Sequence, residues 1–86
     1  MLTLCRKESI VLAELDRRQS TAAGELAHAC GLTFEATAFA LVMLRRDRLV
    51  DYDEIGESQI RLWHTTRRGR DWLLDGAQLA FGVAHA

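Results

Sequence analysis

The stretch TAAGELAHACGLTFEATAFALVMLRRDRLV, residues 21–50, contains two helical patterns separated by a short break. Ser20 and Thr21 stand at the start of the first pattern, and both are good N-cap residues because a short side-chain oxygen accepts a hydrogen bond from an unpaired helix amide. Gly31 follows it, and glycine readily takes the left-handed conformation that ends a helix. A helix over residues 22–30 is therefore expected, with one apolar face formed by Leu26, Ala27 and Cys30.

The second pattern begins after Thr33, another N-cap residue, and is longer than the first. Its buried face is predicted from apolar and small residues at helical spacing, Thr37, Ala40, Leu41 and Leu44. A short helix, a turn that contains glycine and a longer helix are the signature of a helix-turn-helix motif. In such motifs the longer helix lies in the major groove of DNA.

A helix and a β-hairpin are predicted on either side of this motif. Before it, Thr3 is expected to cap a helix that runs to about Arg18, with an apolar stripe formed by Leu4, Val11, Leu12 and Leu15. After it, residues 49–55 and 59–65 read as strands joined by a polar turn that contains glycine. Two strands alone are only marginally stable, so we expect the hairpin to pack on the helices, with Trp63 in the core.

The C-terminal part is predicted to be a last helix followed by an apolar tail. Thr66 is expected to cap this helix, which covers residues 67–74 and loosens near Gly76. One domain is expected over residues 1–76. The tail, residues 77–86, is small, apolar and almost uncharged, and it either continues the helix as a partner-binding surface or frays.

A helix, a helix-turn-helix motif, a hairpin and a closing helix, in this order, resemble the winged helix-turn-helix fold. More narrowly, the chain resembles MarR-type and PadR-type bacterial transcriptional regulators. The resemblance covers about residues 3–74 and is carried by Glu25-Leu26-Ala27, Gly31-Leu32-Thr33, Leu41, Leu44, Leu49-Val50, Arg61 and Thr66-x-x-Gly69-Arg70. It implies a mainly α-helical domain with three helices, a two-stranded wing and a C-terminal helix.

The resemblance also implies a way of binding DNA, in which the longer helix enters the major groove and the hairpin reaches the flanking backbone or minor groove. Ser20 and Thr21 match positions that often bind phosphate, and Arg61 matches a basic position on the wing. Positions at which such regulators present base-reading side chains hold Glu35, Ala36, Ala38 and Phe39. The residues expected to bind the DNA backbone are Ser20, Thr21, Arg45, Arg46, Arg61, Arg67 and Arg68.

The longer helix departs from the pattern of these regulators. Between Thr33 and Leu44 the only charged residue is Glu35, whereas direct readout usually relies on Arg, Asn or Gln. The residues predicted to face a groove or a protein partner are mostly apolar: Phe34, Glu35, Ala38, Phe39, Val42 and Met43. In so small a domain only another chain can cover such a face. The alternative to a DNA-binding transcriptional regulator is therefore a winged-helix module for protein–protein interaction or homodimerisation through this helix.

The charge distribution leaves both hypotheses open. The 86 residues carry a formal net charge of −1 and a pI of about 6.3, whereas a dedicated DNA-binding protein usually has a basic footprint. Acidic residues also surround the predicted wing tip, at Asp51, Asp53, Glu54 and Glu57. Arginines cluster at positions 45–48 and 67–70, however, and either cluster forms a phosphate-contacting stripe if the fold brings it beside Arg61.

Other chemistry is not indicated. The histidines and cysteines lack the spacing of metal ligands, no serine stands in a nucleophile elbow, and no glycine-rich phosphate loop is present. We therefore expect no enzyme, cofactor or metal, and no small-molecule ligand is evident. No run has the length of a membrane span and the first residues lack the order of a signal peptide, so a cytoplasmic protein with reduced cysteines is expected.

Overall fold

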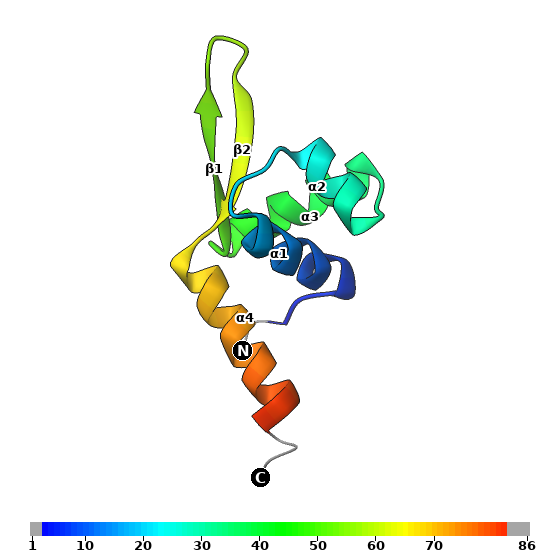
Figure 1. The fold of residues 1–86 in the computed structure, drawn as a ribbon, viewed down its shortest axis with the longest axis vertical. Helices are drawn as coiled ribbons and strands as arrows, with labels where there is room; N and C mark the ends of the chain where they lie inside the picture. Colours follow the sequence, from blue (N-terminus) through cyan, green and yellow to red (C-terminus); the bar gives the residue numbers. More distant parts are fainter. Residues whose placement is uncertain (1–2, 83–86) are drawn as a thin grey trace.

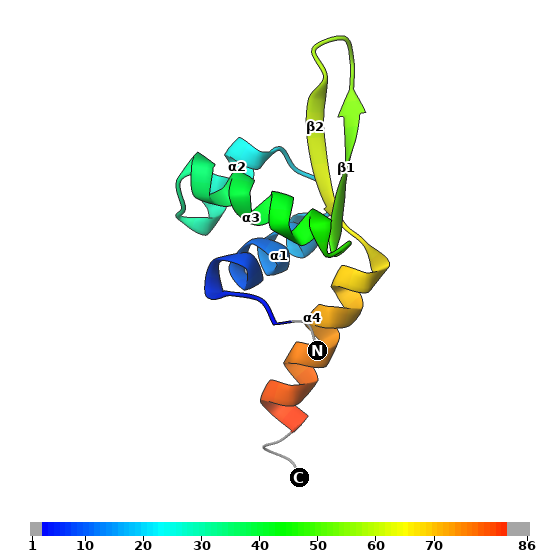
Figure 2. The same cartoon turned by 180° about the vertical axis from the view of Figure 1, so that it is seen from behind.

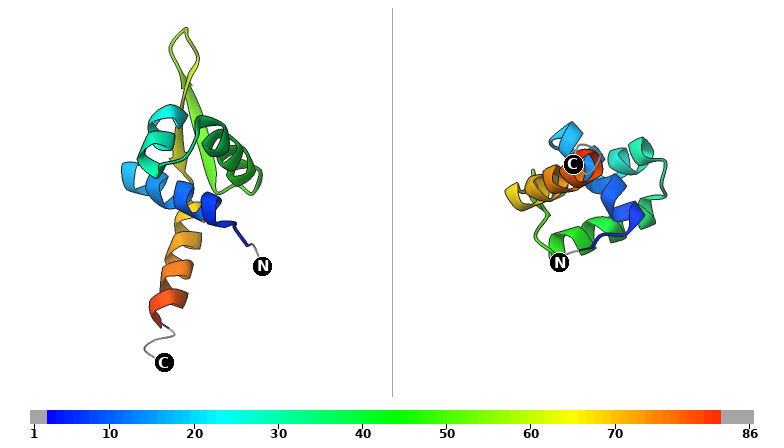
Figure 3. Two further views of the ribbon diagram at one scale, coloured as in Figure 1. Left: turned by 90° about the vertical axis from the view of Figure 1, so that its right-hand side faces the viewer. Right: turned by 90° about the horizontal axis from the view of Figure 1, so that it is seen from below.

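The computed structural model describes residues 3–82, with side-chain surroundings for residues 3–75. In chain order it contains α1 (Arg6–Arg18), α2 (Ala23–Cys30), α3 (Phe34–Arg46), β1 (Val50–Ile55), β2 (Ile60–Thr65) and α4 (Arg67–Gly82). The first three helices form a body beside the base of the hairpin, which projects at one end of the molecule (Figures 1 and 2). Helix α4 leaves in the opposite direction, which makes the molecule elongated, 52 × 24 × 21 Å (Figure 3). The predicted order of elements is confirmed.

The core lies where the three helices of the body meet the base of the hairpin. Helix α3 contributes the face that its sequence period predicts, and α1 contributes its predicted stripe except Leu4, which lies before the helix and is only partly buried. The core, which α2, Leu49 and the hairpin complete, consists of Val11, Leu12, Leu15, Leu26, Ala40, Leu41, Leu44, Leu49, Val50 and Trp63. Removing one such leucine side chain from water contributes about 1.5–3 kcal/mol. Thr37 is also fully buried in this face, so its hydroxyl does not point toward a groove.

The turn of the helix-turn-helix motif has the geometry that its residues indicate. Gly31 ends α2 with φ of 67°, a left-handed conformation. Thr33 then caps α3, because its Oγ1 accepts a hydrogen bond from the Ala36 amide at 3.1 Å. These two residues set the angle at which α3 leaves the turn, and both predictions are confirmed.

Two other predicted caps are wrong. Helix α1 begins at Arg6 behind Cys5, not behind Thr3, since the Glu8 carboxylate accepts a hydrogen bond from the Cys5 amide at 3.0 Å and closes the first turn there. Helix α2 is capped by Ala22 instead of Ser20 or Thr21. Thr21 forms an isolated antiparallel bridge with Trp63 in β2, and this extended pairing delays the start of the helix.

The hairpin pairs β1 with β2 in antiparallel register, from Val50 opposite Thr65 to Ile55 opposite Ile60. Trp63 and Thr65 are buried on one face of β2, which confirms that Trp63 lies in the core. The Thr21 bridge lies on the other edge of β2, so β1 is left as the outer strand of the wing.

Helix α4 is fixed to the end of α3 by its first turn. The Thr66 hydroxyl donates to the Arg48 carbonyl at 2.7 Å and accepts from the Gly69 amide at 3.1 Å, which confirms Thr66 as a cap. The helix passes Gly76 and continues to Gly82, which is the first of the two alternatives left open for the tail, because Ala, Gln and Leu follow that glycine and favour helix. The predicted tail is thus helical up to Gly82, and residues 83–86 lie outside the described residues.

Between residues 3 and 82, no single helix is long and apolar enough to cross a membrane. Helices α2 and α3 reach the length and apolar composition of a membrane span only when they are taken together, and this pair is bent by 110° at the turn.

Candidate nucleic-acid interface

Helix α3 and the hairpin meet at an angle, and the start of α2 lies beside both (Figure 2). The surface between these three elements is hollowed by about 370 Å³. The lining residues come from the start of α2, from α3 and from the hairpin: Ala22, Ala23, Gly24, Phe34, Ala38, Val42, Gln59, Ile60, Arg61 and Trp63. We call this surface the α3–wing hollow.

The outward face of α3 is apolar and open within this chain. Phe34, Phe39 and Val42 are 59%, 68% and 56% exposed. Glu35 is exposed beside them, while Ala38 and Met43 are half-buried. The six residues predicted to face a groove or a partner therefore lie on the surface of α3 or at its margin, in agreement with the sequence pattern.

A second hollow, of about 730 Å³, adjoins the first at the C-terminal end of α3. Arg45, Arg46 and Arg48 line it from one side, and Arg61 lines it from the hairpin. Val42, Arg61 and Trp63 border both hollows, which makes the two a continuous surface. The fold thus brings the 45–48 cluster beside Arg61, one of the two arrangements that the sequence left open. We call this second surface the arginine hollow.

Tyr52 of β1 holds two of these arginines in place. The Cζ atoms of Arg45 and Arg61 lie 4.6 and 4.5 Å from the centroid of the Tyr52 ring. The ring in turn packs at 4.9 Å and 55° against Trp63, whose own side chain is buried. Each exposed cation–π contact contributes about 0.5–1 kcal/mol, so the tyrosine offsets part of the repulsion between the two guanidinium groups.

Two acidic side chains reach the same arginines. Asp51 Oδ1 lies 3.2 Å from Arg45 Nε, and Glu54 Oε1 lies 3.9 Å from Arg61 Nε. The pKa of Asp51 is lowered, first by a hydrogen bond from the Tyr52 amide and then by Arg45. These pairs are exposed to solvent, and such exposed ion pairs hold their partners only weakly.

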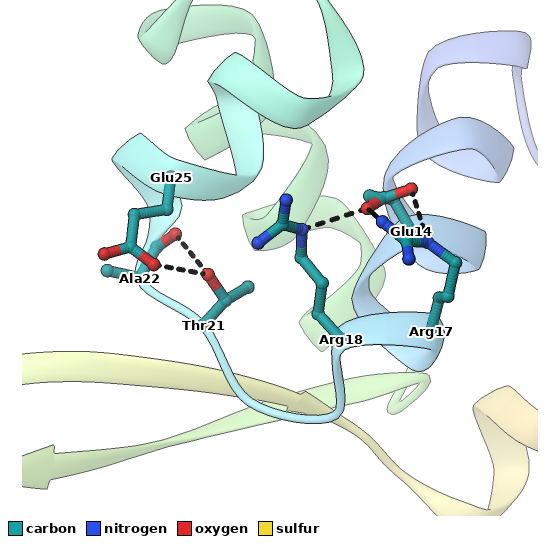
Figure 4. A network of polar contacts seen from close by, with 6 residues as sticks. All are labelled: Glu14, Arg17, Arg18, Thr21, Ala22 and Glu25. Carbon is teal, nitrogen blue, oxygen red and sulfur yellow. Dashed lines mark hydrogen bonds and ion pairs between the residues drawn. The ribbon is translucent and has the colours of Figure 1, made fainter.

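The remaining predicted backbone-binding residues lie elsewhere. Ser20 is exposed, but Thr21 is only 3% exposed, and its hydroxyl lies 3.3 Å from both the Ala22 carbonyl and the Glu25 carboxylate (Figure 4). The Thr21 side chain is therefore turned into the protein and away from any phosphate. Arg67 and Arg68 are exposed on the first turn of α4 and line neither hollow.

Basic residues at the end of α1 are occupied within that helix. Arg17 and Arg18 both donate to the carboxylate of Glu14, at 3.2 and 2.9 Å from their Nε atoms (Figure 4). The Arg17 hydrogen bond is the main reason that the pKa of Glu14 is lowered. These arginines are paired with Glu14 on α1, and they do not line either hollow.

Similarity in three dimensions is clear, although no protein-family model matches the sequence and no curated protein matches it significantly. One similar structure is that of BpsR from Bordetella bronchiseptica, which concerns the regulation of its DNA binding by 6-hydroxynicotinic acid. It has a TM-score of 0.82 and 15% sequence identity, and the match covers 95% of this chain and 59% of that one. The chain has the winged helix-turn-helix fold. The predicted fold class is thereby confirmed, with α3 as the longer helix of the helix-turn-helix motif and the hairpin as the wing.

Two further structures share the fold. A MarR family transcriptional regulator from Silicibacter pomeroyi has a TM-score of 0.79 at 19% identity over 92% of this chain and 54% of that one. A variant of Lactococcus lactis ZitR in complex with DNA has a TM-score of 0.67 at 19% identity over 79% of this chain and 47% of that one. The chain thus spans about half the length of the proteins it matches, and it shares the winged-helix fold with members of the MarR family.

Sequence reasoning missed the role of Tyr52. The contact of Tyr52 with the two arginines depends on the register that sets Tyr52 opposite Trp63, and local sequence patterns do not define this register. Once that register is known, Arg61 is two residues from Trp63 and falls diagonally across from the tyrosine, within reach of the ring.

Proposed function

We propose that this domain binds double-stranded DNA as a cytoplasmic transcriptional regulator. The observation that carries the proposal is the arginine hollow, where Arg45, Arg46 and Arg48 converge with Arg61 at the inner angle between recognition helix and wing. The chain as a whole has a net charge of −1, but local patches of charge govern the approach of a polyanion. Fold neighbours that are DNA-binding regulators support the same reading.

In the proposed complex the recognition helix lies in the major groove and the arginine hollow receives backbone phosphates beside it. Helix α2 begins at Ala23 behind Ala22, which offers no side-chain cap, and Ala22, Ala23 and Gly24 line the α3–wing hollow. The first amides of α2 therefore lie beside the same surface, where an anion can accept from them. Asp53, Glu54 and Glu57 make the outer part of the wing acidic, and Arg61 lies opposite Glu54 in the register. The proposed phosphate contacts therefore lie between Arg61 and the arginines at the end of α3. These contacts position the protein, whereas α3 offers few donors for direct readout of bases.

Binding to a labelled DNA duplex should weaken steeply as salt is raised. Each phosphate contact releases a counterion and contributes about −0.9 to the slope of log K against log salt, so four arginines give a slope of about −3 to −4. Fluorescence anisotropy over a range of about 50–200 mM salt measures this slope. A flat dependence, or no binding at the lowest salt, would argue against the proposal.

The exposed apolar face of α3 favours a second candidate, a module that binds a protein or a second copy of itself through Phe34, Phe39 and Val42. Aromatic residues of this kind are common in protein interfaces.

Light scattering on the wild type and on Phe39→Asp tests whether the face of the second candidate is a self-association surface. Phe39 is 68% exposed, so the variant should stay folded. If the domain uses this face for DNA, we expect the two proteins to have the same molar mass, with circular dichroism confirming that both are folded. A wild-type dimer and a folded monomeric variant would show instead that the recognition helix is a self-association surface.

A further inference from the structure

We propose that the recognition helix reads the C5-methyl groups of pyrimidines in the major groove, those of thymine and of 5-methylcytosine. This inference rests on the DNA-binding function proposed above and adds the chemistry that is read. It concerns the α3 surface that the arginines do not use.

The outward face of α3 is suited to methyl groups by its composition and spacing. Phe34, Ala38 and Val42 follow one another at intervals of four residues and line the α3–wing hollow, while Phe39 lies next to Val42 and is the most exposed large apolar residue of the helix. Glu35 is the only charged side chain among these outward positions. A face without hydrogen-bond donors can form few hydrogen bonds with the edges of bases. The apolar group that pyrimidines present in the major groove is the C5-methyl group, and such a face can contact it.

Charge on the surrounding surface favours DNA over a protein as the partner that covers this face. Val42 borders both hollows, so the apolar face of α3 runs directly into the arginine hollow. Arg45 and Arg61 are already held there against Tyr52. An apolar strip that ends in guanidinium groups matches a major groove, which has methyl groups on its floor and phosphates along its rim.

Glu35 adds a contact that is compatible with one of the two bases. It is exposed one helical turn before Phe39, and its carboxylate can accept a hydrogen bond from the N4 amino group of cytosine. In 5-methylcytosine this amino group stands beside the methyl group. Thymine supplies the same methyl group without the amino group, so both bases belong to the class that the helix recognises.

Four duplexes that differ only in these methyl groups test the inference. Alternating A·T duplexes are made with thymine or with uracil, and alternating G·C duplexes with 5-methylcytosine or with cytosine. At low salt, anisotropy competition should show tighter binding to the methylated member of each pair, by about fourfold for each methyl group that the helix covers.

Two variants assign the effect to α3. In Phe39→Ala combined with Val42→Ala, both methyl preferences should fall to about one. Ile10→Ala removes an exposed apolar side chain from α1 and should keep both preferences. Amide NMR spectra of each variant verify that the fold is retained.

The possible results distinguish the inference from the function on which it rests. Salt-dependent binding to all four duplexes without a methyl preference would overturn methyl recognition and leave DNA binding standing. A preference in only one pair would overturn recognition of the shared methyl group in favour of sequence-dependent DNA shape. No binding to any duplex at low salt would overturn both proposals and direct attention to a protein partner for the apolar face.

Discussion

The Gly69→Ala variant is expected to lose about 2–3 kcal/mol of unfolding free energy. A Cβ atom at Gly69 would lie 2.1 Å from the Leu49 carbonyl oxygen and 2.7 Å from Thr65 Cγ2. The Leu49 carbonyl cannot retreat easily, because it also accepts a hydrogen bond from the Thr66 amide at 3.0 Å. The first turn of α4 must therefore shift away from the start of β1, although alanine favours helix more than glycine does.

Gly24→Ala is the matched control for this prediction. Gly24 also lies in a helix, but a Cβ atom there would meet no atom within 4 Å. This variant should therefore be neutral or more stable by up to about 1 kcal/mol. Urea unfolding followed by tryptophan fluorescence measures both variants. If Gly69→Ala were as stable as the wild type, the close packing of α4 against the start of β1 would be wrong.

The double variant Arg46→Glu, Arg61→Glu is expected to bind duplex DNA about 100-fold more weakly than the wild type at low salt. It reverses one charge on the recognition helix and one on the wing, on opposite sides of the arginine hollow. A phosphate there would lose two attractive contacts and face two repulsive ones. Both side chains are exposed, so the fold should be retained. Anisotropy titration of one duplex with both proteins measures the effect.

Two controls make this result specific to the hollow. Arg6→Glu with Lys7→Glu changes the net charge by the same amount on the exposed first turn of α1, where acidic residues are compatible with the helix dipole. It should reduce affinity far less. Asp51→Asn should increase affinity several-fold, because Arg45 loses its competing carboxylate. Equal losses in the two double variants would mean that only overall charge matters and that the hollow is not the site.

Local sequence signals predicted those parts of the fold that depend on neighbouring residues. Gly31 and Thr33 define the turn by their own conformations, and the α3 core face follows from helical spacing. The predicted cap of α2 is wrong for a non-local reason. Thr21 is a good N-cap residue, but its backbone pairs with that of Trp63, 42 residues later in the sequence. Local preference was overridden by this strand pairing.

The candidate site was predicted in parts but not as a whole. Sequence alone identified two arginine clusters and the apolar face of α3, because these are properties of composition and helical period. Which cluster joins Arg61 depends on how α3 leads into β1, and this is set by packing of Leu49 and Val50 into the core. The contact of Arg45 and Arg61 with Tyr52 likewise depends on hairpin register and on the position of the helix end.

The most direct test of the proposed interface is an amide NMR titration of the 86-residue chain with a short DNA duplex at low salt. The amide signals of α3, of the start of α2 and of residues 59–63 should shift together, and those of the first turn of α1 should stay in place. That result would map the bound DNA onto the joined α3–wing and arginine hollows. Shifts confined to other surfaces, or no shifts at all, would contradict the account.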